Sequence, residues 1–305
     1  MARQLDTTEA LGGTQNMSRL ALGTVQFGLS YGVANQGGQV SRLAARDMLK
    51  KATACGIDML DTAISYGESE TCLGEVGTQD FKLVTKLPAV PDGCADVKSW
   101  VHEQVSASLT RLGVRAVYGL LLHRPEQLLG ADGQMLSEIL QDLKEMGQVQ
   151  KVGVSIYSPS ELDALTSQYQ FDLVQAPFNL VDHRLRTSGW LQRLKQEGVE
   201  IHTRSVFLQG LLLMPQAAMP HKFAQWADLW NKWHGWLSCH NVSPVQACLG
   251  FSLANPEIDR VVVGADNVGQ LEQIISAAIS VLPVDLPDLR CDAENLINPS
   301  YWPHL

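Results

Sequence analysis

The chain has 305 residues, of which 45% are hydrophobic and 18% charged, and its formal net charge is -9. This composition is typical of a globular protein with enough apolar material for a sizeable core, and it argues against extensive disorder. The acidic balance and the lack of any dense block of lysine and arginine argue against a nucleic-acid-binding surface.

The first residues, MARQLDTTEALGGTQN, contain no apolar segment like that of a signal peptide. We expect residues 1–18 to form an N-terminal tail or cap and residues 19–305 to form the folded domain. No run approaches the ~20 apolar residues of a membrane span, so no membrane association is expected. The six cysteines have no C-x-x-C or zinc-like spacing, which favours free thiols in a cytoplasmic protein and predicts no metal site.

From residue 19 onward, short apolar runs alternate with longer amphipathic stretches, and no Pro/Gly/Ser-rich linker interrupts them. Most runs lack strict alternation, as expected of strands buried on both faces of a parallel sheet. The predicted strands are Leu20–Gly23, Met59–Asp61, Lys82–Lys86, Val117–His123, Lys151–Ser155, Leu173–Gln175, Glu200–Ser205 and Arg260–Gly264.

The amphipathic stretches between these runs are predicted helices. Ser41 is the expected N-cap of the first, which ends near Gly56 and has Leu43, Met48 and Ala52 as its inward candidates. Several of the stretches end at a glycine, as a left-handed C-cap requires. The other predicted helices are Ser69–Gly77, Asp96–Gly113, Met135–Met146, Ser158–Gln168, Leu185–Gly198, Ser243–Asn255 and Val268–Ala278.

Repeating β-then-α units at roughly 30-residue spacing predict a closed (β/α)8 TIM barrel, an α/β fold in a single domain. A doubly wound open sheet is the alternative, but no G-x-G-x-x-G follows the first strand, where GTVQFG has a different spacing. Two pieces fall outside the repeat. Residues 206–240 make a long connection after strand seven and are a candidate substrate cover, and residues 283–305 form a C-terminal tail.

Polar residues stand at the C-terminal ends of the predicted strands, where a barrel of this kind holds its active site. Neighbouring strands therefore present a carboxylate, an ammonium, an imidazole and small polar groups around one opening. Strands two to seven end, in order, in Asp61, Lys86, His123, Ser155, Gln175 and the pair Arg204–Ser205.

Tyr66 lies five residues beyond Asp61 in DTAISYGESE, near enough for its loop to bring the phenol over the same opening. A tyrosine has an ordinary pKa of about 10, and an adjacent ammonium favours the phenolate. Lys86 would provide that ammonium, and His123 would hydrogen-bond a carbonyl oxygen. Each residue alone has a structural explanation, but four such groups on one rim have little structural use because unpaired buried charge costs stability.

The segments DTAISYGESETCLG, LVTKLP and LLLHRPEQL resemble the aldo-keto reductase superfamily, and the likeness runs from Gly23 through Gln273. It implies an NAD(P)-dependent oxidoreductase that reduces an aldehyde or ketone to the alcohol, with a small-molecule carbonyl as substrate. The opening GTVQFGLSYGVAN resembles members linked to sugar metabolism, so sugar-related carbonyls are candidates. The implied catalytic tetrad is Tyr66 as proton donor with Asp61, Lys86 and His123.

The same resemblance implies where a nicotinamide cofactor would bind. Ser155 and Gln175 would hold the carboxamide, residues 205–210 would wrap the diphosphate, and residues 264–273 would hold the adenosine end. Backbone amides near a helix start suit phosphate in any case. The implied cofactor-binding residues are Gly23, Thr24, Asp61, Ser155, Gln175, Arg204, Ser205, Phe207, Gln209, Gly210, Gly264, Asp266, Gln270 and Gln273.

Three places depart from the family pattern. Ile156 stands where an Asn often follows the Ser, which weakens the carboxamide contact. Arg204 replaces a Tyr that commonly stacks on the nicotinamide, so stacking gives way to a guanidinium contact or is lost. Asp266 and Gln270 stand where many NADPH-preferring members carry basic residues, and an Asp facing the ribose favours a free 2′-hydroxyl. We expect NADP(H) ahead of NAD(H), with NAD(H) as the alternative.

Other functions remain as alternatives. A nicotinamide-binding, redox-sensing regulatory barrel with little turnover would resemble the channel-associated members of the superfamily. A metal hydrolase barrel would need a His-x-His pair or clustered carboxylates, which are lacking. We expect a monomer or weak homo-oligomer.

A stripe of tryptophans lies within the long connection after strand seven, at near-helical spacing. It is either core or lid packing, or a stacking platform for a sugar or aromatic substrate. The stripe consists of Trp226, Trp230, Trp233 and Trp236.

Overall fold

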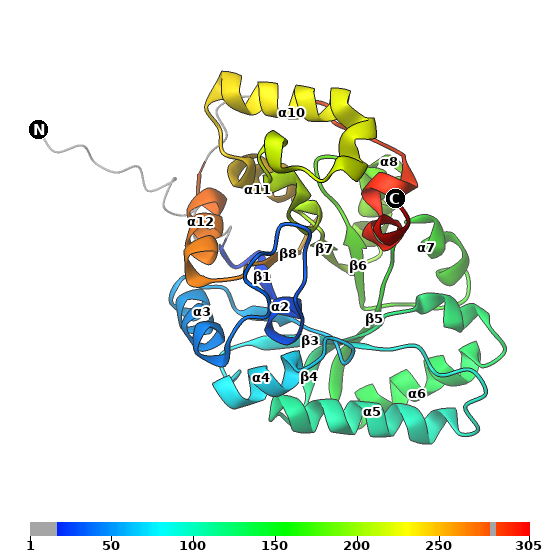
Figure 1. The fold of residues 1–305 in the computed structure, drawn as a ribbon. Helices are drawn as coiled ribbons and strands as arrows, with labels where there is room; N and C mark the ends of the chain where they lie inside the picture. The colour runs from blue at the N-terminus through cyan, green and yellow to red at the C-terminus, as the bar shows by residue number, and fades with distance from the viewer. Residues whose placement is uncertain (1–16, 281–284) are drawn as a thin grey trace, which may run out of the picture.

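The computed structural model describes residues 17–280 and 285–305. At its centre a closed barrel of parallel strands runs in chain order from β1 to β8, and helices surround it (Figure 1). The pairing of β1 with β8 closes the barrel, so the open-sheet alternative is excluded. The strands are β1 (Leu20–Gly23), β2 (Met59–Asp61), β3 (Lys82–Leu87), β4 (Val117–Leu122), β5 (Val149–Ser155), β6 (Leu173–Pro177), β7 (Glu200–Arg204) and β8 (Arg260–Gly264).

The predicted helices lie outside the barrel, and further short segments follow β1, β4 and β7. The α-helices are α2 (Val25–Gly28), α3 (Arg42–Ala54), α4 (Ser69–Val76), α5 (Val97–Leu112), α6 (Gly133–Glu145), α7 (Ser160–Leu165), α8 (Arg184–Thr187), α9 (Trp190–Gln196), α10 (Ala227–His240), α11 (Pro244–Leu253), α12 (Val268–Ala278) and α13 (Glu294–Ile297). The 3-10 segments are η1 (Pro125–Leu129), η2 (Leu208–Leu213), η3 (Gln216–Ala218), η4 (His221–Trp226) and η5 (Pro299–His304).

Two details of the helix prediction are wrong. The single helix predicted from Leu185 to Gly198 is two helices, α8 and α9, because Gly189 adopts a left-handed φ of 83° between them. The predicted inward position of Leu43 is also wrong, since this residue is 68% exposed. Met48 and Ala52 are buried as predicted, and Leu43 lies off their face of the helix. The Ser41 N-cap is confirmed by its bond from the backbone N–H of Ala44.

The barrel interior is built in layers, and its middle layer explains where the polar residues point. This layer is a buried apolar cluster of Ala21, Met59, Val84, Leu121, Leu173 and Val262. Side chains two positions apart on a strand point to the same side. Residues two positions further along these strands therefore form the next layer, at the mouth: Gly23, Asp61, Lys86, His123, Gln175 and Gly264.

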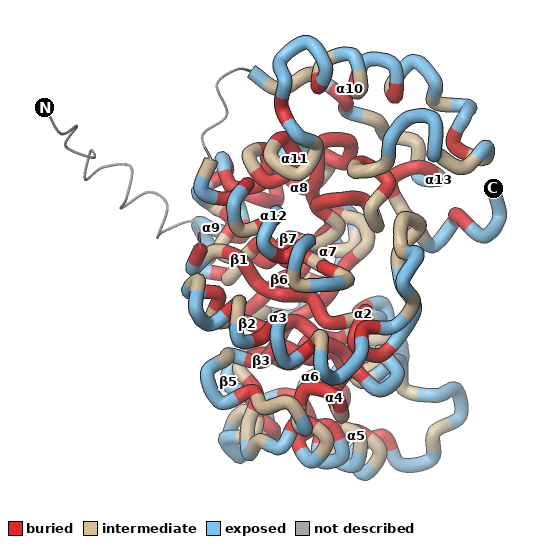
Figure 2. The backbone as a smooth tube through the Cα atoms, turned by 60° about the vertical axis from the view of Figure 1, so that its left-hand side comes forward, coloured by how far each residue is buried: buried red, intermediate tan, exposed pale blue. Residues whose placement is uncertain are grey.

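The opposite end of the barrel is closed by a polar cluster. Glu200 accepts hydrogen bonds from the Tyr118 hydroxyl at 2.6 Å and from Lys151, and its other oxygen lies 2.7 Å from Nε2 of His202. Most residues of the central strands are buried, as Figure 2 shows, and the exceptions lie at or near the strand ends. A ligand would therefore reach the polar layer from the C-terminal ends of the strands.

The structure describes the C-terminal segment up to Leu305, whereas at the N-terminus it begins at Met17. Residues 1–16 of the expected tail or cap lie outside the described residues, and Met17 is buried in the core. The C-terminal segment packs against the connection after β7, where the Trp302 and Phe223 rings meet edge to face at 4.8 Å (Figure 1). None of the helices in the described part of the chain is long and apolar enough to cross a membrane.

Candidate active site

The loop that carries Tyr66 is fixed to the barrel by a buried cluster of hydroxyl groups. The Ser69 hydroxyl, at the start of α4, donates to the Thr24 carbonyl oxygen at 2.8 Å and lies 3.1 Å from the Thr62 hydroxyl. The Thr24 hydroxyl donates to the Asp61 carbonyl oxygen at 3.0 Å. The ends of β1 and β2 and the start of α4 are thus held together beneath Tyr66.

Glu70 holds the same helix against the barrel wall, with a side chain that is 1% exposed. One carboxylate oxygen accepts from Thr85 at 2.7 Å and from Ser108 at 2.6 Å, and the other accepts two bonds from Arg111. A fully satisfied buried carboxylate of this kind rigidifies its surroundings.

A close approach of two backbones also positions Tyr66. A Cβ atom added to Gly28 would lie 1.8 Å from the Tyr66 carbonyl oxygen, so only glycine fits at this point. Gly67 faces Gly28 across the contact with a φ of 55°. Gly28 was not singled out from the sequence, because nothing in GTVQFG reveals which loop its backbone meets.

A buried ion pair lies at the floor of the mouth. Lys86 Nζ donates to Asp61 Oδ1 and to the Thr62 carbonyl oxygen, both at 2.7 Å, and the two charged side chains are 1% and 7% exposed. The same nitrogen lies 5.1 Å from the centroid of the Tyr66 ring. The structure thus brings the predicted carboxylate, ammonium and phenol together.

Burial controls the titration of these groups. Burial, and after it the negative charge of Asp61, raises the pKa of Tyr66, while the Arg204 cation opposes the shift. Tyr66 is therefore a phenol at neutral pH and can donate its proton. Burial also lowers the pKa of Lys86, and attraction to Asp61 opposes this change.

His123 completes the group from the end of β4. Its ring meets the Tyr66 ring edge to face with centroids 5.9 Å apart, and its Nδ1 lies 3.2 Å from the Ser65 hydroxyl. Burial, with the positive charges of Lys86 and Arg204, lowers the pKa of His123 to about 4. The imidazole is neutral at neutral pH. Ser65 was not singled out from the sequence.

Ser155 and Gln175 adjoin the ion pair. Gln175 donates from Nε2 to Asp61 Oδ2 at 2.7 Å, and its Oε1 accepts from Ser155 at 3.3 Å. Both side chains are buried at the mouth, on neighbouring strands in register. Two further predicted residues, Gly23 and Gly264, are paired across β1 and β8 and leave that part of the rim without side chains.

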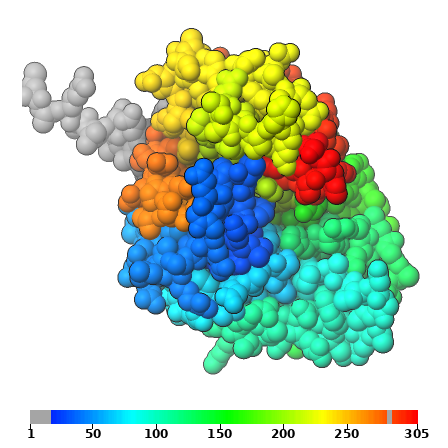
Figure 3. Space-filling model, viewed as in Figure 1, coloured from blue at the N-terminus to red at the C-terminus, as the bar shows by residue number. Residues whose placement is uncertain are grey.

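The loop after β7 has an unusual backbone. Ser205, Leu208 and Gln209 adopt left-handed φ values of 62°, 48° and 52°, which non-glycine residues rarely do, and Gly210 follows with 90°. Gln209 donates from Nε2 to the Tyr31 hydroxyl at 2.9 Å. The loops after β1 and β7 therefore meet above the end of β8, and Figure 3 shows the blue loop lying between α12 and the yellow-green segment.

A hollow of about 480 Å³ lies beyond this contact, between the loop after β1 and the start of α12. Asp266 faces it and accepts from Asn35 at 3.1 Å, and Gln270 also lines it. No Arg or Lys from the described part of the chain lines it. Within the mouth, by contrast, Gln26 keeps a buried side-chain oxygen without a hydrogen-bond partner, close to Gly264.

Three predicted cofactor residues lie away from these openings. Thr24 is fully buried and its hydroxyl is engaged within the protein. Phe207 is 7% exposed and belongs to the hydrophobic core. Gln273 is exposed, one turn beyond Gln270 on α12, and does not line the hollow.

Arg204 closes the β7 side of the mouth together with two tyrosines that were not singled out from the sequence. Its guanidinium lies 4.7 Å from the centroid of the Tyr157 ring. The electrostatic interactions of Tyr31 include both Arg204 and Tyr66. The mouth is therefore lined by phenol groups and a guanidinium as well as by the predicted tetrad.

The tryptophan stripe packs within the connection after β7. Trp230 and Trp233 are buried, and their indole N–H groups donate to backbone carbonyl oxygens of Phe223 and Leu212. These contacts favour the packing explanation. Across residues 17–280 and 285–305, no group of three or more His, Cys, Asp or Glu side chains could hold a metal ion.

Comparison with known proteins gives a consistent result. A sequence model described as the Aldo/keto reductase family matches residues 19–285. The chain is 28% identical to L-galactose dehydrogenase of Arabidopsis thaliana, over 94% of this chain and 91% of that protein. It is 23% identical to NADH-specific methylglyoxal reductase of Escherichia coli K12, over 92% and 96% of the two chains.

The fold is likewise shared with a solved structure. The holo form of the aldo-keto reductase AKR11C1 from Bacillus halodurans superposes with a TM-score of 0.69 at 20% identity, over 88% of each chain. The family match includes all eight strands and the three segments that carry Asp61 and Tyr66, Lys86, and His123. The chain belongs to the aldo-keto reductase family.

Proposed function

We propose that this protein reduces an aldehyde or ketone to the alcohol with a reduced nicotinamide cofactor, and that Tyr66 donates the proton. The observation that carries the proposal is the buried Lys86–Asp61 pair beneath the Tyr66 ring, with a neutral His123 at the edge of that ring. Cations and hydrogen-bond donors aimed at a developing oxyanion are the usual means of accelerating such a reaction.

Each side chain then has a role. Ser65 donates to Nδ1 of His123, which leaves the hydrogen on Nε2 to bind the carbonyl oxygen. Tyr66 Oη donates its proton to the same oxygen, and the Lys86 ammonium stabilises the phenolate that remains. Asp61 holds Lys86 in place. The nicotinamide, when bound, supplies the hydride to the carbonyl carbon.

The residues along the mouth fit such a cofactor. Ser155 and Gln175 offer hydrogen-bonding groups beside the ion pair. The paired Gly23 and Gly264 carry no side chains, and Gln26, which lies against Gly264, has an unmatched polar atom. The loop at residues 205–210 mixes left-handed φ values, at Ser205 and at residues 208–210, with ordinary ones, and turns of this type can bind anions, which suits the diphosphate. Residues 266–270 would hold the adenosine end.

For the cofactor, the hollow at Asp266 favours NAD(H), which was the alternative from the sequence. The described residues of its lining include a carboxylate and no cation, so a 2′-phosphate would meet like charge while a free ribose hydroxyl could donate to Asp266. A relative of this chain is an NADH-specific reductase. We therefore propose NAD(H) as the preferred form.

The relatives point to small polar carbonyls as substrates. Their names refer to methylglyoxal and to L-galactose, a small ketoaldehyde and a sugar. We propose a small aldehyde, ketone or sugar-related carbonyl as the substrate. We also propose that residues 19–305 act as one domain, in a cytoplasmic monomer or weak homo-oligomer.

Side-by-side fluorescence titrations with NADH and NADPH, followed by a carbonyl panel with whichever binds, test the proposal. We expect tighter binding of NADH and measurable turnover. Replacement of Asp266 by Arg should move the ratio of the two dissociation constants toward NADPH by about tenfold or more, because an ion pair replaces repulsion. Binding without turnover of any carbonyl would instead favour the redox-sensing barrel.

A further inference from the structure

Arg204 lies across the mouth of the barrel. It is the last residue of β7, yet its Nη2 donates to the Ile156 carbonyl oxygen, just beyond the end of β5, at 3.0 Å. Because β6 lies between β5 and β7, the side chain must pass over the end of β6 to make this bond. The guanidinium also stacks on Tyr157 and donates to the Ser205 hydroxyl at 3.2 Å.

This cation has no acidic partner among the described residues. None of the ion pairs that the structure describes includes Arg204. Three acids of this region are already engaged: Asp61 is paired with Lys86, and Asp182 and Glu294 are paired with Arg184. His123 adds no charge at neutral pH, since its pKa is lowered to about 4. The mouth therefore carries one unmatched positive charge.

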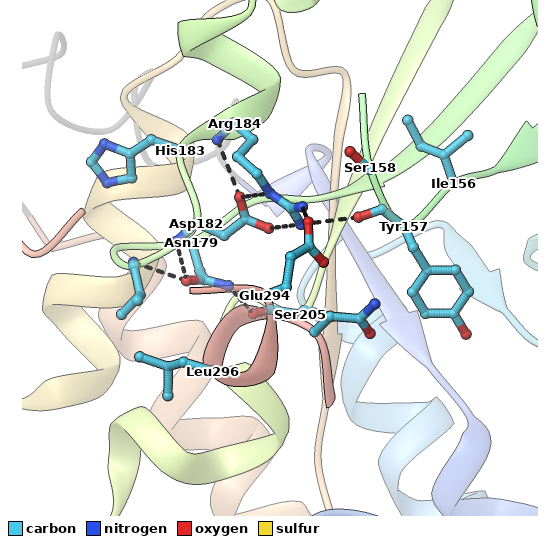
Figure 4. A network of polar contacts seen from close by, with 12 residues as sticks. Ile156, Tyr157, Ser158, Asn179, Asp182, His183, Arg184, Ser205, Glu294 and Leu296 are labelled. Carbon is cyan, nitrogen blue, oxygen red and sulfur yellow. Dashed lines mark hydrogen bonds and ion pairs between the residues drawn. The ribbon is translucent and has the colours of Figure 1, made fainter. Parts of the chain in front are cut away.

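Tyr157 and Ser205, which flank Arg204, are held in place through their backbone carbonyl oxygens. Arg184 forms a fork with Asp182, donates from Nη2 to the Tyr157 carbonyl oxygen at 3.0 Å, and also binds Glu294 of α13. Asn179 donates to the Ser205 carbonyl oxygen at 3.0 Å. Figure 4 shows this network, with the Tyr157 ring pointing away from Arg184. Tyr157, on which Arg204 stacks, and Ser205, its neighbour in the chain, are thus both preorganised.

Arg204 ends β7 at the same barrel mouth where Lys86 lies on β3 and His123 directly follows β4. Its charge lowers the pKa values of Tyr66, Lys86 and His123, so all three share one electrostatic environment with it. A guanidinium has five N–H donors in a planar fork that matches a carboxylate or phosphate. Its contacts with Ile156 and Ser205 leave donors over for a ligand.

We propose that Arg204 binds an oxyanion of the substrate, so that the preferred substrates are small aldehydes or ketones carrying a carboxylate or phosphate. This inference rests on the proposed reductase function and specifies its substrate class. The acid group would satisfy the unmatched guanidinium while the carbonyl faces Tyr66 and His123. A site with net positive charge also raises the local concentration of anionic substrates.

The test compares matched pairs of substrates. The carboxylate pair is 4-oxobutanoate and butanal, and the phosphate pair is glyceraldehyde 3-phosphate and glyceraldehyde. We expect the wild type to show a higher kcat/KM for the anionic member of at least one pair, and the two pairs tell carboxylate from phosphate. In Arg204→Gln the ratio of anionic to neutral kcat/KM should fall by about 10- to 100-fold, as expected for the loss of a charge-assisted hydrogen bond.

A binding measurement accompanies the kinetics. Butanoate should bind the enzyme–cofactor complex, by isothermal titration, more tightly than butanamide in the wild type, and this difference should disappear in Arg204→Gln. Arg204→Lys keeps the positive charge but not the planar guanidinium, so its ratio of anionic to neutral kcat/KM should lie between those of the wild type and Arg204→Gln. It also provides a second variant should Arg204→Gln not fold. Arg193→Gln is the matched control, since Arg193 stacks on Trp190 at 4.2 Å but is paired with Glu197. Its ratios should equal those of the wild type.

Three outcomes would overturn the inference. The first is a wild type that prefers the neutral member of both pairs. The second is an Arg204→Gln variant in which anionic and neutral substrates lose the same factor while the NADH dissociation constant rises, because Arg204 would then serve the cofactor. The third is an unchanged ratio in both Arg204 variants. In each case turnover of neutral carbonyls would leave the reductase function intact, whereas no turnover of any carbonyl would refute that function itself.

Discussion

Lys86 and Asp61 form an ion pair in which Nζ lies 2.7 Å from Oδ1 and both side chains are almost fully buried. Removing one member of a buried pair leaves the other charge uncompensated, which typically costs about 3–5 kcal/mol. We expect Lys86→Met to lower the free energy of unfolding by about this amount, measured by urea denaturation. The double variant Asp61→Asn/Lys86→Met should be less destabilised than the sum of the two single variants.

The same variants separate stability from catalysis. Carbonyl reduction should be lost in Lys86→Met and should stay lost in the double variant, since no ammonium remains to stabilise the Tyr66 phenolate. A double variant that regains activity along with stability would show that Lys86 acts only as a structural partner of Asp61.

Tyr66→Phe tests the proton donor directly. The ring and its contact with His123 remain, and only the hydroxyl is removed, so we expect kcat to fall by about 10²–10⁴-fold, the usual contribution of a general acid. The dissociation constant for NADH, measured by fluorescence, should stay nearly unchanged. Tyr169→Phe is the control, because that hydroxyl binds the Leu128 carbonyl oxygen and is not part of the proposed site. Retention of most of kcat in Tyr66→Phe would rule out the assignment.

His123 should affect how stability depends on pH. Its pKa in the folded protein is lowered from 6.5 to about 4, so between these values the unfolded chain binds more protons than the folded one. The contribution of His123 to stability is therefore present above pH 6.5 and is lost as the pH falls toward 4. Urea unfolding at pH 7 and pH 5 should show a smaller loss of stability in His123→Gln than in the wild type.

His183 also has a pKa lowered by burial, and it is present both in the wild type and in His123→Gln. Its contribution to the loss of stability is therefore the same in the two proteins, and their difference reports on His123. An equal loss of stability in wild type and His123→Gln would mean that His123 titrates normally. The reductase reaction should likewise show no inflection near pH 6.5 that depends on His123.

Gly28→Ala should impair catalysis without touching a catalytic side chain. The new methyl group would overlap the Tyr66 carbonyl oxygen, so the Tyr66 loop must move. A small misplacement of a reacting group can cost on the order of 10²-fold in rate, and we expect a loss of this order in kcat. Gly235→Ala, on α10, is the control because a Cβ there meets no atom within 4 Å. Equal kcat in the two variants would show that the Tyr66 loop tolerates the displacement.

The sequence alone predicted much of the barrel and of its rim. Strands β1, β2 and β8 have the predicted bounds, because short apolar runs between helices leave little choice. The polar residues that end those runs could be grouped since parallel strands of a barrel all end at the same rim. The break in the helix predicted from Leu185 to Gly198 was missed because an isolated glycine is often tolerated in a helix.

Contacts between distant segments were decided only by the tertiary structure. Gly28 meets the Tyr66 carbonyl oxygen, Arg204 reaches past β6 to Ile156, and Asn35 reaches Asp266, and none of these pairs has a local pattern. Periodicity and strand ends depend on neighbours in the chain, so the sequence determined which residues face the mouth. How loops from different strands meet depends on closure of the barrel. Closure also places Arg204 across the mouth, where its guanidinium has no described acidic partner.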